Sequence, residues 1–236
     1  MNPAQQCRHA LAAAVVAFGL LLGPASASAQ TGPSNSEAAA YTGLHAAAWR
    51  GDLAAVQKLL GSKVDLDARD GHGRTAVHVA AFARKPEMVR ALAKAGAKLE
   101  LLENDRYDAV TIAAVANDET TLRTLLSLGA SAKLTTSRYD GTALIASAHL
   151  GHVGVVKQLI AAGAPLDHVN NLHWTALIEA VVLGDGGARH TEVVRSLVAA
   201  GASTRLTDRN GQTPLALARA RGYQDMVRIL EAAGAP

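Results

Sequence analysis

The chain has 236 residues, of which 49% are hydrophobic, 3% are aromatic and 18% are charged, and its formal net charge is +3. This composition is too apolar for a disordered chain and too poor in glycine and proline for a fibrous protein. The positive charge is weak and forms no basic block, so we expect no nucleic-acid partner, because tracking phosphates needs a concentrated basic face.

Residues 1–29 have the features of a secretory signal peptide. Arg8 supplies a positive charge, residues 10–23 form an uncharged apolar run, and Pro24 precedes a small-residue cleavage site at residues 27–29. This run is short for crossing about 30 Å of hydrocarbon. We therefore expect export with cleavage near Gln30, no stable membrane insertion after cleavage, and a periplasmic location, with secretion beyond the periplasm as the alternative.

The expected cleavage removes the single cysteine, Cys7, which lies before the apolar run. The mature chain then has no thiol for a disulfide, for catalysis or for metal binding. Residues 30–40 read as a short polar linker, and the folded domain is expected to cover residues 41–236.

The domain repeats with a period near 33 residues. One set of markers is spaced by 33, 33, 34, 33 and 38 residues, namely Thr42, Thr75, Asp108, Thr142, Thr175 and Thr213. A second set is spaced by 33, 33, 34, 38 and 33 residues, namely Lys63, Gly96, Gly129, Gly163, Gly201 and Gly234. Two independent sets that keep one period indicate a solenoid of stacked units.

The residues around the markers resemble a known family. The segments are TGLHAAAWRGD from Thr42, TAVHVAAFA from Thr75, TALIASAHLGH from Thr142 and TPLALARARGY from Thr213. They resemble the T-P-L-H-x-A-A-x-x-G-H core of the ankyrin repeat. The resemblance implies an all-α ankyrin-repeat solenoid of about six repeats with short β-hairpin-like turns. The implied repeats are 41–69, 70–102, 103–136, 137–169, 170–207 and 208–236.

Repetition also predicts the local structure. Each unit carries two apolar helical stripes that cannot be buried by one unit alone, so that neighbouring units must share a core. The threonine at the start of each unit is expected to cap its first helix, and the glycine near its end to adopt the left-handed conformation. Asp108 replaces that threonine in the third unit, and Arg84 and Asn117 stand where the family has glycine. We expect mild backbone strain at Arg84.

The fifth unit is five residues longer than its neighbours, between Leu183 and Glu192. We interpret this insertion as an extended turn. The alternative is an anion site, because glycines before a helix can present backbone N–H groups and Arg189 and His190 add charge. The stretch NNLHWTALIEAVVLGDGGARH from Asn170 is similar to exported bacterial ankyrin-repeat proteins.

The candidate binding residues lie outside the repeating pattern, on the turns between units, which we call fingers, and on the first helices. The resemblance implies that these positions face the concave side. Tryptophan, tyrosine and arginine are the residue types that most often anchor protein interfaces. The alternative is that the rings cover finger backbones and fill gaps between repeats. The predicted protein-binding residues are Trp49, Arg74, Phe82, Arg106, Tyr107, Arg138, Tyr139, His149 and Trp174.

A metal site is an alternative use of one finger. Asp167, His168 and His173 lie close in sequence, and three convergent ligands suffice for zinc. Nothing in the sequence makes them converge, so satisfied or solvated imidazoles are the simpler interpretation. His45 and His78 occupy the family's motif position and are expected to be structural.

No catalytic motif is present in the sequence, neither a nucleophile elbow nor a zinc-protease or dinucleotide-binding pattern. We therefore expect no enzyme activity and no cofactor. The expected function is a protein-binding module of the bacterial cell envelope that regulates, or protects against, an envelope enzyme or toxin. The alternatives are an exported protein that binds a metal or small ligand, and a secreted effector or scaffold.

Overall fold

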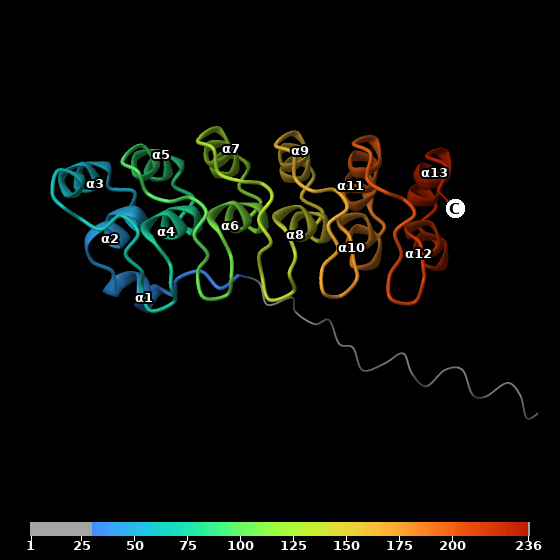
Figure 1. The fold of residues 1–236 in the computed structure, drawn as a ribbon, viewed down its shortest axis with the longest axis horizontal. Helices are drawn as coiled ribbons and strands as arrows, with labels where there is room; N and C mark the ends of the chain where they lie inside the picture. Colours follow the sequence, from blue (N-terminus) through green and yellow to red (C-terminus); the bar gives the residue numbers. More distant parts are fainter. Residues whose placement is uncertain (1–29, 236) are drawn as a thin grey trace, which may run out of the picture. The chain divides into compact units, whose positions relative to one another are not determined.

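The computed structural model describes residues 30–235, in which six helix pairs follow one another along the chain (Figure 1). The first helices of the pairs are α2 (Gly43–Arg50), α4 (Ala76–Phe82), α6 (Ala109–Val115), α8 (Ala143–His149), α10 (Ala176–Val182) and α12 (Pro214–Ala220). The second helices are α3 (Leu53–Leu60), α5 (Pro86–Lys94), α7 (Glu119–Ser127), α9 (Val153–Ala161), α11 (Ala188–Ala199) and α13 (Gln224–Ala232). The expected helical solenoid is confirmed. The predicted signal peptide, residues 1–29, lies outside the described residues.

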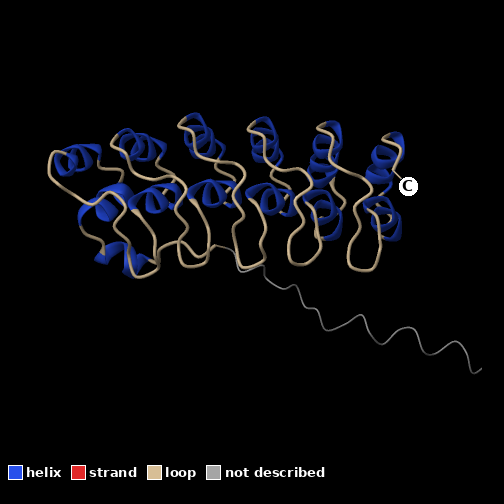
Figure 2. Cartoon of the chain, viewed as in Figure 1, coloured by secondary structure: helices blue, strands red, loops and turns tan. Residues whose placement is uncertain are grey.

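The helices form two layers, and the fingers project from the layer of first helices (Figures 1 and 2). In residues 32–235 each first helix packs against its own second helix and against the first helix of the next repeat. No strand is present in the part of the chain that the structure describes; Thr136 and Gly141 form one isolated antiparallel bridge. The fingers are therefore hairpin-like turns without a sheet.

Backbone hydrogen bonds close the fingers and join each to the next. Asp70 N–H donates to the Arg74 carbonyl at 2.9 Å, and the Asp70 carboxylate accepts from the N–H groups of His72 and Arg74. Asn104 N–H donates to the His72 carbonyl of the preceding finger at 3.0 Å. These bonds satisfy backbone groups that no helix or sheet pairs.

The expected helix caps form in most repeats. Thr142, Thr175 and Thr213 each accept a hydrogen bond from the N–H three residues later, and Asp108 does the same in the third repeat. Aspartate therefore caps the helix of the third repeat as threonine does in the last three repeats, because both side chains can accept this bond. The expectation is wrong for Thr42, whose side chain makes no capping bond.

The glycine near the end of each repeat was expected to adopt the left-handed conformation, and the φ angles are 100° at Gly96 and 95° at Gly201. Arg84 and Asn117 adopt the same conformation, with φ angles of 54° and 52°. An L-residue is strained there by about 1 kcal/mol or more. The Arg84 guanidinium donates to the Ala116 carbonyl of the next repeat at 2.6 Å, so the strained residue also joins two repeats.

One continuous apolar core runs through the repeats. Its clearest column lies on the second helices, where the same position is fully buried in five successive repeats, namely at Leu92, Leu125, Leu159, Leu197 and Leu230. Such a column fits close packing of identical units. No helix of the described residues combines the length and apolarity needed to span a bilayer.

The expected linker contains an additional helix, α1 (Asn35–Ala40). Ser34 accepts a hydrogen bond from Glu37 N–H, and the Glu37 carboxylate accepts from Ser34 N–H, which is a complete capping box. Residues 35–40 of the expected short polar linker are therefore helical.

Candidate functional site

The predicted residues lie on the face formed by the fingers and the last turns of the first helices, which we call the finger face. Trp49, Phe82 and His149 all lie in the last turn of a first helix, in α2, α4 and α8. Each is partly buried, so that part of each ring is solvated. The repeat register placed these three residues in equivalent slots, as the sequence predicted.

Arg74 differs from the prediction that it is an accessible binding residue. Its side chain is only 3% exposed and lies 3.2 Å from the Glu37 carboxylate and 3.7 Å from that of Asp70. Its guanidinium carbon lies 5.6 Å from the centre of the Phe82 ring, within the range of a cation–π interaction. Glu37 of α1, Asp70 and Phe82 all lie against this side chain.

Two neighbouring fingers bring four predicted residues together. Arg106 bonds the Asp140 carboxylate at 2.8 Å, and Arg138 bonds the Asp105 carboxylate at 3.2 Å. Their tyrosines complete the group, and Tyr139 is 45% exposed. Burial raises the pKa of Tyr107, whose neighbours include Asp105, Arg138 and Tyr139. We call this group the fingertip cluster: Asp105, Arg106, Tyr107, Arg138, Tyr139 and Asp140.

In two fingers, a residue other than glycine occupies a position whose left-handed backbone only glycine adopts without strain. Gly73 and Gly211 occupy the fourth position of their fingers with φ angles of 72° and 73°. Arg106 and His173 occupy the same position with φ angles of 67° and 64°. Strain of this kind persists only where the surroundings hold it, and it is common at functional sites. Alignment of the fingers in the sequence would have revealed these two positions, which repeat counting alone did not.

A buried carboxyl beside Asn170 and His149 was not predicted. Glu179 on α10 is 5% exposed, and its Oε1 accepts from the Asn170 amide at 2.8 Å. The other oxygen, Oε2, lies 3.7 Å from His149 Nδ1. Burial raises the pKa of Glu179 to about 7, and burial lowers that of His149, with His190 adding to the effect.

Asn170 explains why Glu179 is tolerated. It occupies the finger position of Asp70, and its side-chain oxygen Oδ1 accepts from the N–H groups of Leu172 and Trp174, as an aspartate oxygen would. The amide end remains available to donate to Glu179. An aspartate at 170 would place a second negative charge against the buried carboxyl.

The zinc alternative is not supported, because two of its three side chains are bound to other groups and the third is exposed. His168 Nε2 lies 2.6 Å from the Asp140 carbonyl, and Asp167 accepts from Ser203 N–H at 2.8 Å. His173 is exposed on its finger. Within residues 30–235 no group of three histidine, cysteine or acidic side chains is placed to hold a metal ion.

The insertion lengthens the turn before α11 to residues 183–187, as the favoured interpretation predicted, and it also extends α11 at its start. His190 Nε2 lies 2.9 Å from the His149 carbonyl, and Tyr223 donates to the Gly184 carbonyl at 3.0 Å. The structure gives the anion alternative no support at Gly187, because Asp185 already accepts from the Gly187 N–H at 2.9 Å and pairs with His190. The Gly187 N–H group is thus bound to a carboxylate of the chain.

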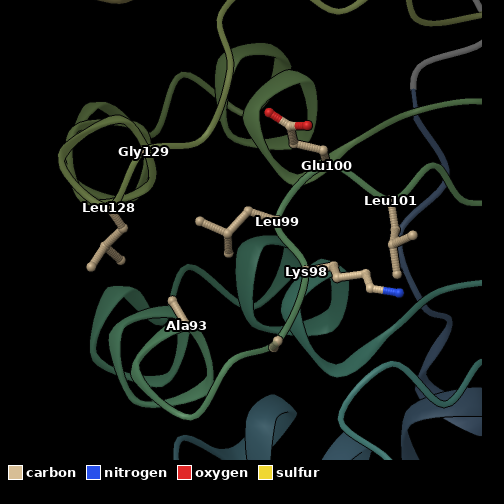
Figure 3. Close-up of a pocket in the computed structure, with 8 residues that line it drawn as sticks. Ala93, Lys98, Leu99, Glu100, Leu101, Leu128 and Gly129 are labelled. Carbon is tan, nitrogen blue, oxygen red and sulfur yellow. The ribbon is translucent and has the colours of Figure 1, made fainter.

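A pocket of about 420 Å³ lies away from the predicted residues, between the ends of α5 and α7 (Figure 3). Leu99 points between Ala93 and Leu128 there, and Lys98 and Glu100 flank it. None of the predicted binding residues lines it.

The comparisons agree with this architecture. The family model described as ankyrin repeats (3 copies) matches residues 44–136, and that of the ankyrin repeat matches residues 139–171. The putative ankyrin repeat protein YahD of Escherichia coli (strain K12) is 42% identical over 100 residues. That match spans 42% of this chain and only half the length of YahD.

Two solved structures extend the likeness over most of the chain. An ankyrin repeat domain from Acinetobacter baumannii AYE is 42% identical with a TM-score of 0.78, and the match covers 82% of this chain and 98% of that one. A chain in the structure of the Bd0816 predatory endopeptidase from Bdellovibrio bacteriovorus in complex with immunity protein Bd3460 is 25% identical. Its TM-score is 0.68, and the match covers 81% of this chain and 98% of that one. With the helix pairs, fingers and caps described above, these matches show that the chain belongs to the ankyrin-repeat family.

Proposed function

We propose that this protein binds another protein through its finger face and catalyses no reaction itself. Ankyrin repeats are protein–protein interaction modules, which makes binding the function of the repeats here. The observation that carries the proposed location of the site is the fingertip cluster, in which arginine and tyrosine side chains gather on two adjacent fingers. Side chains of these types dominate the binding energy of most interfaces.

The fingertip cluster suits recognition for a second reason. Its arginines are paired with aspartates across the fingers and are 48% and 63% exposed, so they are held in place without being covered. Exposed pairs of this kind contribute little to folding, about 0–1 kcal/mol. Positioned but solvated, the four charges and two rings can be desolvated by a partner without first being rearranged.

The proposed role is regulation of, or protection against, an enzyme or toxin of the bacterial cell envelope. Two observations support it. Residues 1–29 have the sequence features of an export signal, and one related structure contains an endopeptidase in complex with an immunity protein. An exported binder without catalytic machinery suits such a role, because occupying an enzyme's surface requires no chemistry.

The test of binding is retrieval of a partner from envelope extract, followed by affinity measurement with the purified partner. Alanine at both Tyr139 and Trp174 is expected to weaken binding by about 100-fold, since two anchor residues are lost. The matched control is Arg123→Ala, an exposed change on α7 in the other helix layer. Equal affinities of wild type, double variant and control would place the binding surface elsewhere.

The proposed location is tested separately by cell fractionation. The full chain is expected in the periplasmic fraction in a shortened form, and a chain starting at Gln30 behind a new methionine is expected in the cytoplasm. Appearance of the full chain mainly in the culture medium would favour the secreted effector instead.

A further inference from the structure

The segment before the first repeat lies on the finger face rather than away from it. We call residues 32–40, which include α1, the strap. In Figure 1, α1 lies beneath α2 at the level of the first fingers. α1 packs against α2 of the first repeat, and the strap also reaches His72, Arg74 and Phe82 of the second repeat. A segment that capped the end of the solenoid alone would not reach the second finger.

A single carboxylate connects the strap to the finger. Glu37 Oε1 lies 2.7 Å from His72 Nε2 and 3.2 Å from the Arg74 guanidinium, while Oε2 accepts from Ser34 N–H at 2.8 Å. The bonds with Ser34, and then the charges of Arg74 and His72, lower the pKa of Glu37 to about 2. The carboxylate is therefore ionised at physiological pH and serves the helix cap and the ion pairs at once.

Besides these contacts, α1 packs against α2 of the first repeat. None of the residues of α1 is buried, so apolar burial contributes little to its attachment. A helix of six residues is also too short to persist alone in water. Docking and helix formation are thus coupled, and loss of the Glu37 contacts should release the strap as unstructured chain.

The surface beneath the strap is a built site. Arg74 is 3% exposed, with its guanidinium over the Phe82 ring, and is fixed by Asp70 on its other side. Gly32 lies against Phe82: a methyl group added there would come within 3.1 Å of a ring carbon, closer than carbon atoms pack. The site therefore accepts a carboxylate with a glycine five residues before it.

We propose that the strap is a built-in occupant of this site and that an acidic segment of the protein partner displaces it. This inference rests on the proposed function, since it assigns part of the finger face to the partner and names the chemistry that the partner presents there. The Glu37 carboxylate stands in for a partner's aspartate or glutamate, which would pair with Arg74 and His72 and lay a small residue on Phe82. Binding at this end of the face then requires the strap to leave.

The competition has a predictable size. A segment tethered directly beside its site has an effective concentration of about 1 mM. If the same segment binds as a free peptide with a dissociation constant of about 0.1 mM, the tethered copy lowers the apparent affinity for a competing peptide by about tenfold. Removing the carboxylate from the tethered copy should therefore raise the apparent affinity for the competing peptide by about tenfold.

The experiment uses the mature chain, residues 30–236, and a fluorescent peptide with the sequence of residues 31–41. Glu37→Gln protein is expected to bind this peptide about tenfold more tightly than wild type. The control Asn35→Ala changes an exposed strap residue but keeps the carboxylate, and should behave as wild type. A peptide carrying Glu37→Gln should bind neither protein measurably.

Two further variants test the site itself within the Glu37→Gln background. His72→Ala, which removes an exposed ring that the folded chain does not need, should weaken peptide binding severalfold. Arg74→Gln should abolish it, with circular dichroism confirming that the repeats remain folded. Equal peptide affinity of wild type and Glu37→Gln protein, or binding that survives both site changes, would overturn the inference.

Amide hydrogen exchange separates this inference from the proposed function because it needs no partner. The amides of residues 37–40 are expected to exchange about tenfold more slowly in wild type than in Glu37→Gln protein, where they should exchange at the rate of unstructured chain. Unchanged protection would overturn the strap as a displaceable segment even if the fingertip variants lose a partner. Loss of protection together with peptide binding would support the strap as a displaceable segment, even if the fingertip variants still bind a partner.

Discussion

At the scale of single residues, the buried Glu179 is the clearest departure from the repeating pattern. Equivalent positions of the first helices hold apolar residues, for example Val79 and Ile112. A carboxyl in such a place is tolerated because it is protonated over part of the pH range and bonded to Asn170. The position also lies between His149 and the finger that carries Trp174, where a partner is proposed to bind.

Glu179 should make the stability of the protein depend on pH. Its pKa is about 7 in the folded chain against an ordinary value of 4.5, so the folded state holds its proton more tightly than the unfolded state does. The associated stability is fully present below pH 4.5 and is lost as the pH rises through 7. The loss amounts to about 3 kcal/mol.

Urea unfolding of wild type and Glu179→Gln from pH 4 to pH 8 measures this effect. The glutamine keeps the size of the side chain but cannot ionise. The free energy of unfolding of the variant should therefore rise by about 3 kcal/mol relative to that of wild type as the pH increases across the range. NMR titration of the Glu179 carboxyl carbon gives an independent midpoint near 7. A constant difference between the two proteins would show that Glu179 ionises as it does in solvent.

Part of the site was readable from residue types, and part required the fold. The slots of Trp49, Phe82 and His149 follow from the repeat register, which fixes every equivalent position at once. The covering of Arg74 by Glu37 joins residues far apart in sequence, and only the folded segment shows it. The Ser34-x-x-Glu37 pattern of a capping box was nevertheless visible and predicts the start of α1.

At the scale of elements, the fifth repeat shows how an insertion is absorbed. In the fourth repeat, His152 bonds the Ala114 carbonyl of the preceding first helix at 3.0 Å. Counted back from the second helix, His190 is the equivalent residue, and it bonds the His149 carbonyl at 2.9 Å. Of the five additional residues, two lengthen the turn before α11 and three lengthen α11 at its start, and the link between repeats stays in place.

His190→Ala should therefore destabilise the protein by about 2 kcal/mol, since it leaves a carbonyl of the last helical turn without its donor and removes a buried ring. Arg189→Ala changes the exposed neighbour and should alter stability by less than about 0.5 kcal/mol. Urea unfolding at pH 7.5 compares the two. Similar small effects of both changes would mean that the loop is held without the histidine.

The elements themselves were predictable because the same pattern recurs six times. The spacing of Thr75 and Gly96, repeated along the chain, fixes where each helix pair begins and ends. The earlier start of α11 at Ala188 was not predictable in this way, because an insertion has no counterpart in the other repeats. The expectation of hairpin-like turns left open whether the fingers contain strands. Within the described chain, backbone turn bonds and side-chain hydrogen bonds close the fingers, and only one isolated bridge is present.

At the scale of the whole repeat domain, stability comes from contacts between neighbours. Each second helix packs on the next, as α5 does on α7 and α7 on α9. A solenoid of this kind has the stability of its units plus that of its interfaces, so damage in the middle affects both halves. The terminal repeats have one neighbour each and depend most on the units beside them.

Leu125→Asp tests this dependence at the centre of the buried leucine column. Leu125 is fully buried in α7, and an aspartate there would carry a charge into the shared core without a partner. The expected loss is about 4 kcal/mol or more, which is a large part of the stability of a domain of this size. Thermal unfolding should show a lowered midpoint for the repeats on both sides of α7, as amide hydrogen exchange in the first and last repeats can verify.

Arg123→Asp, two residues earlier on the exposed side of the same helix, should leave the midpoint nearly unchanged. If Leu125→Asp unfolded as wild type does, the second helices could not share the core described here, and the register of all six repeats would be wrong.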